Sequence, residues 1–320
     1  MHRTRGNKKI KYRLYVIYKD INNRGKMIRI AIPKGSLEAQ TLLLFKQADL
    51  EIKVTSREYS PRIEDPRIER VKILRPQEIP EYVERGYFDV GITGKDWIEE
   101  RGADVEEIAD LSYSKTAEKE STVKIVLAVH EEGTDIRAAK EIKPGSNIST
   151  EYPNLTKAFF DKLGIPVQIF FSYGATEAKD MMDGIVELTE TGETLRKNNW
   201  RIIDTILEST TKLISNRASW RDEEKRQEIE EIRTLLSGVI EARGRVLLNM
   251  NVAEDRLKEV VSVLPAMKRP TISQLYGNSQ HRYYAVETVV SKREVNILIP
   301  ALKRKGAEDI IEIDITKIVR

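Results

Sequence analysis

From Met27 onward, short apolar runs alternate with stretches of helical spacing, and this alternation limits the fold more than any other feature. The first clean strand is expected at Ile28–Ile32, followed by a turn at Pro33-Lys34-Gly35 and a helix with Ser36 as its N-cap. The repeat of strand, turn and helix is typical of α/β layering with mainly parallel strands. Further strands are expected at Val71–Leu74, Phe88–Ile92, Lys124–Val129, Val167–Phe171 and Gly184–Leu188, and further helices at Glu78–Arg85, from Asp96, at Asn154–Leu163 and from Gly192 or Glu193.

Two lobes are expected in the first part of the chain. The polar stretch 101–122 is interpreted as a crossing between them, and the apolar run Arg201–Leu207 as the return to the first lobe. Two lobes joined by crossing segments form a cleft, so the predicted architecture is a two-lobed, periplasmic-binding-protein-like unit. The predicted boundaries are 27–118 and 201–221 for the first lobe and 119–200 for the second.

The last third of the chain predicts a linking helix and a separate small domain. Ile229, Ile232, Leu236 and Val239 follow one another at spacings of three, four and three, so they share one face of a helix within 222–243. Residues 244–320 then read strand, helix, strand, strand, helix, strand. This βαββαβ order is that of a ferredoxin-like, ACT-like domain. Domains of this size often sense small ligands, although the fold alone does not establish that role.

Cysteine is absent, which excludes disulfide frameworks, thiolate zinc sites and cysteine nucleophiles. The three histidines, at positions 2, 130 and 281, are too scattered to suggest a histidine metal cluster. No run approaches 18 apolar residues and no signal-peptide pattern is present, so no membrane partner is expected. We expect a soluble protein in a reducing, cytoplasmic setting.

The net charge of +3 hides an asymmetry along the chain. Residues 1–26 carry nine Lys or Arg against one acid, whereas the remaining 294 residues carry 45 basic and 50 acidic side chains. A basic arm can bind nucleic acid by neutralising phosphates. The simpler interpretation is a basic N-terminal extension, or an upstream start that is not used, so a nucleic-acid partner is not expected.

The segment Asp183–Leu195 carries the strongest chemical signal. A strand is expected to bring two acids, Asp183 and Glu187, to its carboxyl end, before a hydroxyl-rich turn with one glycine opens a helix. Backbone N–H groups at a helix start, with threonine hydroxyls beside them, can hold a phosphate. The two acids suit ribose hydroxyls or a magnesium ion. The pattern therefore predicts a sugar-phosphate site, although an ordinary strand–turn–helix with a threonine cap has the same spacing.

A resemblance that covers nearly the whole chain from Met27 strengthens this prediction. Five blocks in order are similar to ATP phosphoribosyltransferase of histidine biosynthesis: Ile30–Gly35, Arg75–Gly86, Asp89–Asp96, Thr150–Leu155 and the Thr-Gly-x-Thr-Leu loop. Two later blocks, Leu264–Ser273 and Leu298–Lys303, resemble the regulatory domain of the long form of that enzyme. The resemblance implies feedback inhibition by histidine.

The reaction implied by this resemblance joins N1 of the adenine of ATP to C1 of phosphoribosyl pyrophosphate, with inversion and release of pyrophosphate. Adenine N1 is already nucleophilic, so no side chain is assigned as an acid or base. An oxocarbenium-like transition state depends on positioning and charge neutralisation. The expected cofactor is Mg²⁺, which is commonly bound through substrate phosphates and one or two carboxylates.

The substrate residues are assigned on the loop and on the resemblance. Asp183 and Glu187 are expected to bind the ribose hydroxyls or their magnesium ion. The glutamates of the turn are expected to point outward, so that only their backbone N–H groups contribute. The 5-phosphate loop is then Thr189, Glu190, Thr191, Gly192, Glu193 and Thr194.

The nucleotide is expected at the carboxyl end of the first strand, where α/β sheets usually bind ligands. Position 36 is a serine where the family usually has arginine, which removes one candidate contact to an anion. Arginines 57 and 75 match the family's blocks and are the expected substitutes, although each could be an ordinary surface charge. The nucleotide candidates are Lys34, Gly35, Ser36, Arg57, Arg75, Thr93, Gly94, Lys95, Glu151 and Tyr152, the last two being equally suited to a structural cap.

In the last domain, Asn251 at a strand end and Thr271 in a Pro-Thr turn are expected to bind the histidine effector at a subunit interface, or else to stabilise the turn. The expected assembly is a homo-oligomer, from dimer to hexamer. The competing interpretation of the whole chain is a two-lobed small-ligand-binding regulatory module without catalysis.

Overall fold

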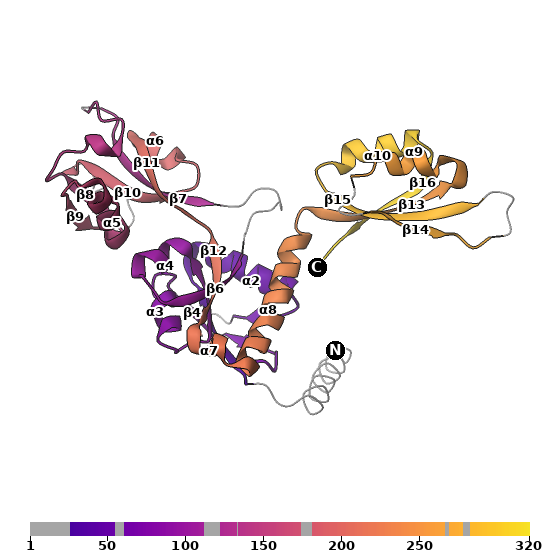
Figure 1. The fold of residues 1–320 in the computed structure, drawn as a ribbon, viewed down its shortest axis with the longest axis horizontal. Coiled ribbons are helices and arrows are strands. Elements are labelled where there is room, and N and C mark those ends of the chain that lie inside the picture. The colour runs from indigo at the N-terminus through magenta and orange to yellow at the C-terminus, as the bar shows by residue number, and fades with distance from the viewer. Residues whose placement is uncertain are drawn as a thin grey trace. The chain divides into compact units, whose positions relative to one another are not determined.

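A computed structural model describes residues 26–54, 61–111, 122–132, 134–173, 181–265, 269–277 and 282–320 (Figure 1). The chain forms two compact units, of which the first ends at Thr234 and the second begins at Leu235, within one helix. Most of the N-terminal extension and Arg57 lie outside the described residues.

The first sheet has five strands in the order β4-β1-β5-β12-β6 among the described residues. Its strands β4, β1 and β5 run parallel, while β12 runs antiparallel to both β5 and β6. The predicted first strand and the helix after it are confirmed, but Ser36 is not the N-cap: it lies inside a 3₁₀ turn that precedes the helix, whose N-cap is Leu37. The elements are β1 (Ile28–Pro33), η1 (Gly35–Leu37), α2 (Glu38–Gln47), the hairpin β2 (Ile52–Lys53) and β3 (Arg62–Ile63), β4 (Ile68–Leu74), α3 (Ile79–Glu84), β5 (Val90–Gly94), α4 (Lys95–Arg101), β6 (Val105–Asp110) and β12 (Thr211–Asn216).

The second sheet also has five strands, in the order β11-β7-β10-β8-β9. Here β10, β8 and β9 run parallel, and β7 is antiparallel to β10 and β11. Apolar clusters lie on both faces, one around Phe160 and one around Trp200. The elements are β7 (Val123–His130), η2 (Ala139–Glu141), β8 (Asn147–Thr150), α5 (Pro153–Leu163), β9 (Gln168–Phe171), β10 (Gly184–Thr189), α6 (Glu193–Lys197) and β11 (Trp200–Ser209).

The return of the chain to the first sheet differs from the prediction. The run Arg201–Leu207 does not return the chain, because it lies in β11 and pairs with β7 of the second sheet. The crossing comes at Thr210, between β11 and β12. The chain passes directly from β11 to β12, which pairs antiparallel with β5 and β6, and both sheets are mixed rather than mainly parallel.

Two helices follow the first sheet, α7 (Arg217–Arg221) and α8 (Glu223–Ala242). The four apolar residues that predicted the linking helix are all buried on α8. A buried carboxylate, Asp89, ties the start of these helices to the sheet. It accepts hydrogen bonds from Arg29 Nε (3.0 Å), Ser219 Oγ (2.7 Å) and Lys225 Nζ (2.5 Å).

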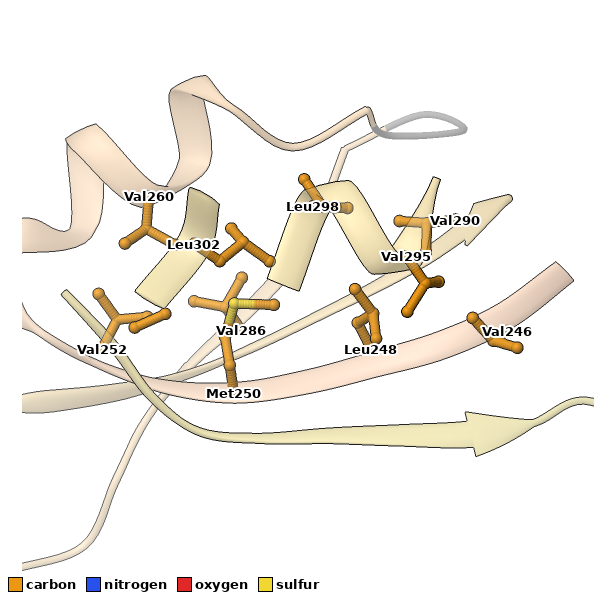
Figure 2. Packing of buried hydrophobic residues seen from close by; sticks show 11 residues of the cluster. Val246, Leu248, Met250, Val252, Val260, Val286, Val290, Val295, Leu298 and Leu302 are labelled. Carbon is orange, nitrogen blue, oxygen red and sulfur yellow. The ribbon is translucent and has the colours of Figure 1, made fainter. Parts of the chain in front are cut away.

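The second unit has the predicted βαββαβ order and an antiparallel sheet ordered β14-β15-β13-β16. Figure 2 shows its core, in which Leu248 and Met250 of the central strand meet Leu298 and Leu302 of a helix. Side chains of β13 alternate between buried and half-buried, as expected for a sheet covered on one face. The elements are β13 (Arg245–Ala253), η4 (Glu254–Arg256), α9 (Leu257–Ser262), β14 (Thr271–Gln274), β15 (Tyr283–Ser291), α10 (Val295–Arg304) and β16 (Ala307–Asp314).

The Asp89 contacts predict a defined acid sensitivity. Burial acts to raise the pKa of Asp89, but hydrogen bonds from Arg29, Lys225 and Ser219 outweigh it and lower the pKa from 3.8 to about 2. Because the unfolded chain takes up the proton first, this group stabilises the fold above about pH 4 and loses that contribution as the pH falls towards 2. The free energy involved is about 2 kcal/mol.

We therefore expect the difference in unfolding free energy between wild type and Asp89→Asn to shrink by about 2 kcal/mol from about pH 4.5 to pH 2. Urea unfolding over that pH series measures the difference, in which other titrating groups cancel. A difference that stays constant would contradict the role assigned to Asp89.

Candidate functional site

The turn after β10 lies at the carboxyl end of the middle strand of the second sheet. Gly184, Ile185 and Val186 are buried, and the strand then emerges, with Glu187 half-buried and Leu188 exposed. A cavity of about 490 Å³ lies at this end of the strand. Its lining consists of Glu187, Leu188, Thr189, Glu190, Thr191, Thr194 and Leu195.

Threonine hydroxyls and one glycine shape this turn. Gly192 has a φ of +72° and is the N-cap of α6. Its N–H donates to Thr189 Oγ1 (2.8 Å), and the N–H of Glu193 donates to Thr191 Oγ1 (3.4 Å). A hydroxyl that accepts a hydrogen bond still has its own O–H to donate, so both threonines can brace the turn and contact an anion.

The two glutamates of the turn differ in position: Glu190 lines the cavity, contrary to the expectation that it points away, whereas Glu193 does not line it. Glu193 pairs with Lys197 (2.7 Å) one turn further along the exposed side of α6, and Glu190 is exposed. Arg196 Nη2 donates to the Thr191 carbonyl oxygen (3.3 Å), which places a guanidinium beside the turn. The sequence analysis did not single out Arg196. Its position one helical turn after Gly192 was the signal that could have identified it.

Asp183 is separated from the turn, contrary to the prediction that two acids meet at the carboxyl end of the strand. It precedes β10, and its carboxylate accepts the N–H of Asn147 (2.8 Å) at the start of β8. Four residues of extended strand span about 13 Å, so Asp183 and Glu187 do not share one magnesium ion or one ribose. Glu187 alone lies at the turn.

A row of three cationic residues marks the corresponding edge of the first sheet. Arg75 follows β4, Lys34 follows β1 and Lys95 follows β5, and these three strands are parallel neighbours in that order. Their carboxyl ends therefore lie about 5 Å apart from strand to strand. Arg75 and Lys34 are exposed and Lys95 is half-buried. Such a row suits a ligand with several phosphates.

The other nucleotide candidates divide into two groups. Gly35, with a φ of +84°, and Ser36 lie exposed in the turn after β1, and Gly94 precedes α4. Thr93 and Tyr152 are buried, and their hydroxyls donate to Pro76 O (2.8 Å) and to Asp96 Oδ2 (3.0 Å).

Both hydroxyls are used within the protein, and for Tyr152 this favours the structural alternative over a contact with the nucleotide. Burial, together with the neighbouring Asp96 carboxylate, raises the pKa of Tyr152, which keeps its phenol protonated. Glu151, the residue before Tyr152, is half-buried.

In the second unit, Asn251 and Thr271 are not brought together. Asn251 Nδ2 donates to Asp309 Oδ2 (2.9 Å), and both residues line a cavity of about 290 Å³ that also includes Arg282. Thr271 is exposed on β14 and does not line this cavity. Asp309, which the sequence did not single out, has a φ of +47°, a conformation that a residue other than glycine adopts at a cost.

Within the described parts of the chain, no group of three or more His, Cys, Asp or Glu side chains could hold a metal ion. Nor is any helix in those parts long and apolar enough to cross a membrane.

Comparisons with known proteins agree over most of the chain. Residues 75–238 match the family model described as ATP phosphoribosyltransferase, and residues 242–317 match the model described as HisG, C-terminal domain. ATP phosphoribosyltransferase from Chlorobium phaeovibrioides is 46% identical over 301 residues, which cover 93% of this chain and 100% of that protein. The enzyme from Pelotomaculum thermopropionicum is also 46% identical, over 91% of this chain and 99% of its own length.

A solved structure resembles part of the fold. It is described as the ATP phosphoribosyl transferase (HisG:HisZ) complex from Thermotoga maritima, with a TM-score of 0.56 and 25% sequence identity. The match covers 66% of this chain and 99% of the compared chain.

The geometry of the turn after β10 predicts a measurable cost for a side chain at Gly192. A Cβ there would combine a left-handed backbone with a separation of 2.9 Å from Ile202 Cδ1. Gly164 has a similar φ of +70° but no atom within 4 Å of the same position. Because Ile202 Cδ1 is the end of a side chain that can shift, Gly192→Ala should lower the free energy of unfolding by only about 1 kcal/mol more than Gly164→Ala does. Equal losses for the two variants in urea unfolding would show that the turn relaxes freely.

Proposed function

Because the chain belongs to the ATP phosphoribosyltransferase family, we propose that it binds phosphoribosyl pyrophosphate on the turn after β10 and ATP on the row of Arg75, Lys34 and Lys95. The chain is a glycosyltransferase of histidine biosynthesis, and family membership favours catalysis over a binding module without catalysis. The observation that supports the proposed sites is that hydroxyl and cationic side chains lie at the carboxyl ends of parallel strands in both sheets.

The turn after β10 suits the 5-phosphate of the pentose. Its cavity is open, the hydroxyls of Thr189 and Thr191 retain donors, and Arg196 supplies positive charge beside them. Because α6 has only five residues, its dipole is a minor term, so the hydroxyl, backbone and guanidinium donors would carry the binding. Glu187, half-buried at the same end of β10, is the carboxylate placed to accept hydrogen bonds from the ribose hydroxyls.

The transfer step itself requires little chemistry from side chains. The lone pair on adenine N1 forms a bond to ribose C1 while the bond from C1 to the pyrophosphate oxygen breaks, and its electrons leave with pyrophosphate. The ring carries positive charge at that point, so correct positioning and neutralisation of the leaving group dominate the rate. The cationic row on the first sheet is suited to neutralise the phosphates of ATP. It therefore compensates for Ser36, which stands where the family usually has arginine.

A divalent metal fits this arrangement best when it is bound mainly through the phosphates of the substrate. The described residues offer Glu187 but no cluster of acids, and Mg²⁺ commonly binds through substrate phosphates with few protein ligands. We propose Mg²⁺ as that metal, neutralising the departing pyrophosphate when it is bound.

For the second unit we propose regulation by histidine. The cavity beside Asn251 offers a carboxylate, Asp309, for an amino group and a guanidinium, Arg282, for a carboxylate. Thr271 could contribute from another subunit of a homo-oligomer, since it does not line this cavity. Coupling to the catalytic unit would run through α8, which belongs to both units. The coupling free energy between two such sites is typically about 1–3 kcal/mol.

We also propose that the catalytic unit has the two predicted lobes, with one boundary changed: the chain returns to the first lobe at residue 210 rather than at residue 201. Since ATP and phosphoribosyl pyrophosphate are charged metabolites of the cell interior, we propose a cytoplasmic location.

The phosphate turn can be tested with Thr191→Val, which replaces a hydroxyl by a methyl group of similar size. A hydrogen bond to a charged group contributes about 1.5–3 kcal/mol, so the KM for phosphoribosyl pyrophosphate should rise about tenfold or more. The KM for ATP should stay within about twofold, because that site lies on the other sheet. Magnesium-dependent release of pyrophosphate measures both constants, and chelation of the metal should abolish it.

Thr205→Val, at an exposed position of β11, is the matched control and should behave as wild type. An unchanged KM for phosphoribosyl pyrophosphate in Thr191→Val would refute the assignment of the phosphate to this turn.

Histidine regulation is tested by calorimetry with L-histidine and by inhibition of the initial rate. Asp309→Asn should weaken histidine binding at least about tenfold, since a charged hydrogen bond is lost, while the uninhibited rate stays unchanged. Asp314→Asn, at an exposed position of the same strand, should bind normally. Absence of histidine binding by the wild type would refute the regulatory proposal.

A further inference from the structure

Helix α4 links the two sheets of the catalytic unit through a buried carboxylate. Asp96, near the start of α4, accepts hydrogen bonds from Ser209 Oγ (2.6 Å) and from Tyr152 Oη (3.0 Å). The Ser209 hydroxyl also accepts the N–H of Asp96 (3.0 Å). The exposed fractions of Asp96, Tyr152 and Ser209 are 3%, 2% and 0%. Three elements that are far apart in sequence therefore meet at one carboxylate.

A second carboxylate of the same helix caps a helix of the second lobe. Glu100 accepts the backbone N–H groups of Asn154 (3.0 Å) and Leu155 (2.9 Å), which are the first free donors of α5. The Asn154 side chain donates in return to the Glu100 carbonyl oxygen (2.9 Å). The N-cap residue of α5, Tyr152, provides no side-chain cap of its own. Glu100 thus supplies from another lobe the cap that local sequence normally supplies.

The apolar residues of α4 extend the same contact. Trp97 stacks on Tyr152, with ring centroids 4.5 Å apart and an angle of 28° between the planes. Trp97 also belongs to the apolar cluster of the second sheet, together with Ile125 and Phe160. Although α4 continues directly from β5 of the first sheet, it therefore buries one face in the core of the second.

The position of α4 relates it directly to the proposed substrate sites. Lys95, the last member of the cationic row, is the first residue of α4, and its N–H donates to Thr210 O (2.9 Å) at the crossing between the sheets. Tyr152 follows β8, whose carboxyl end neighbours that of β10. The network around α4 thus lies between the edge proposed for ATP and the edge proposed for phosphoribosyl pyrophosphate.

We propose that Asp96 and Glu100 are positioning residues for the transfer step, which fix the nucleotide edge of the first sheet relative to the phosphoribosyl edge of the second. This inference rests on the proposed substrate sites. Neither carboxylate touches a substrate in this role; they act through Tyr152, Ser209 and the start of α5.

Two directional contacts explain why carboxylates serve here better than further apolar packing. Apolar surfaces can slide, whereas hydrogen bonds weaken steeply when their angles change. A buried carboxylate or helix start left without partners costs free energy, so only one arrangement of the lobes satisfies both groups. Asp96 and Glu100 are four residues apart, about 6 Å along the helix, and two anchors at that separation fix rotation as well as distance.

A positioning role affects the rate of the bound complex rather than the binding of either substrate. Each substrate binds to its own lobe, so loosening the contact between lobes leaves the separate affinities intact. A misplacement of about 1 Å between reacting atoms costs on the order of a hundredfold in rate. A purely structural role would instead alter stability alone.

The test uses Tyr152→Phe, which removes only the hydroxyl given to Asp96, and Glu100→Gln, which retains one acceptor for α5. Calorimetry with each substrate alone gives the two dissociation constants, and a single-turnover measurement with both substrates bound gives the rate of transfer. We expect the rate to fall at least about tenfold in each variant while both dissociation constants stay within about threefold. Glu100→Ala, which retains no acceptor, should be slower than Glu100→Gln.

Matched controls are Glu99→Gln, the exposed neighbour on α4, and Tyr82→Phe, on α3; both should keep the wild-type rate. All rates are measured well below the unfolding midpoint of each variant, so that a loss of folded protein does not enter them. If Glu100→Ala does not fold, Tyr152→Phe and Glu100→Gln still decide the question.

The inference would be overturned if Tyr152→Phe and Glu100→Gln transferred at the wild-type single-turnover rate. It would also be overturned if the rate fell only as much as the affinity for one substrate fell. A wild-type chain that binds both substrates without transfer would overturn the proposed function as well. The two failures are distinguishable because the first leaves transfer by the wild type intact.

Discussion

The direct passage of the chain from β11 to β12 constrains the whole catalytic unit. Strand β12 pairs antiparallel with β5 in the first sheet, and β11 pairs antiparallel with β7 in the second. The remaining strands of each sheet include a parallel group of three. Parallel strands end at a common edge, and this is where both groups of side chains proposed to bind phosphates lie. The topology of the two sheets therefore determines where the candidate substrate-binding residues lie.

Buried carboxylates then determine how elements far apart in sequence fit together. Asp89 ties α7 and α8 to the first sheet, and Asp96 and Glu100 join α4 to the second lobe. Each is matched by donors from a distant segment, and a buried carboxylate without donors would be costly. Such contacts add little net stability compared with apolar burial, but they exclude arrangements that leave them unmatched. For the transfer step proposed above, in which no side chain is assigned as an acid or base, precise relative placement matters most.

The two units divide their tasks in different ways. The catalytic unit carries its candidate ligand residues at strand ends, whereas the second unit has a cavity lined by Asn251 of β13, Asp309 of β16 and residues 274–277 and 282–283. Helix α8 begins in one unit and ends in the other, with a continuous buried apolar face. Helix α8 is therefore the element through which the proposed coupling between the two units would pass.

The sequence by itself determined most of the elements and the presence of a threonine-rich turn after β10, because periodicity and turn chemistry are local. The strand before Lys34, the buried face of α8 and the threonine turn at Gly192 were all predictable in this way. Tertiary structure alone decided that Asp183 lies away from Glu187, since residue spacing does not say where a strand begins. It also decided that Tyr152 points inward and that Glu100 caps α5, a partner 54 residues away in sequence. Hydrogen bonds between such distant segments leave no periodic trace, so they exist only once the chain has folded.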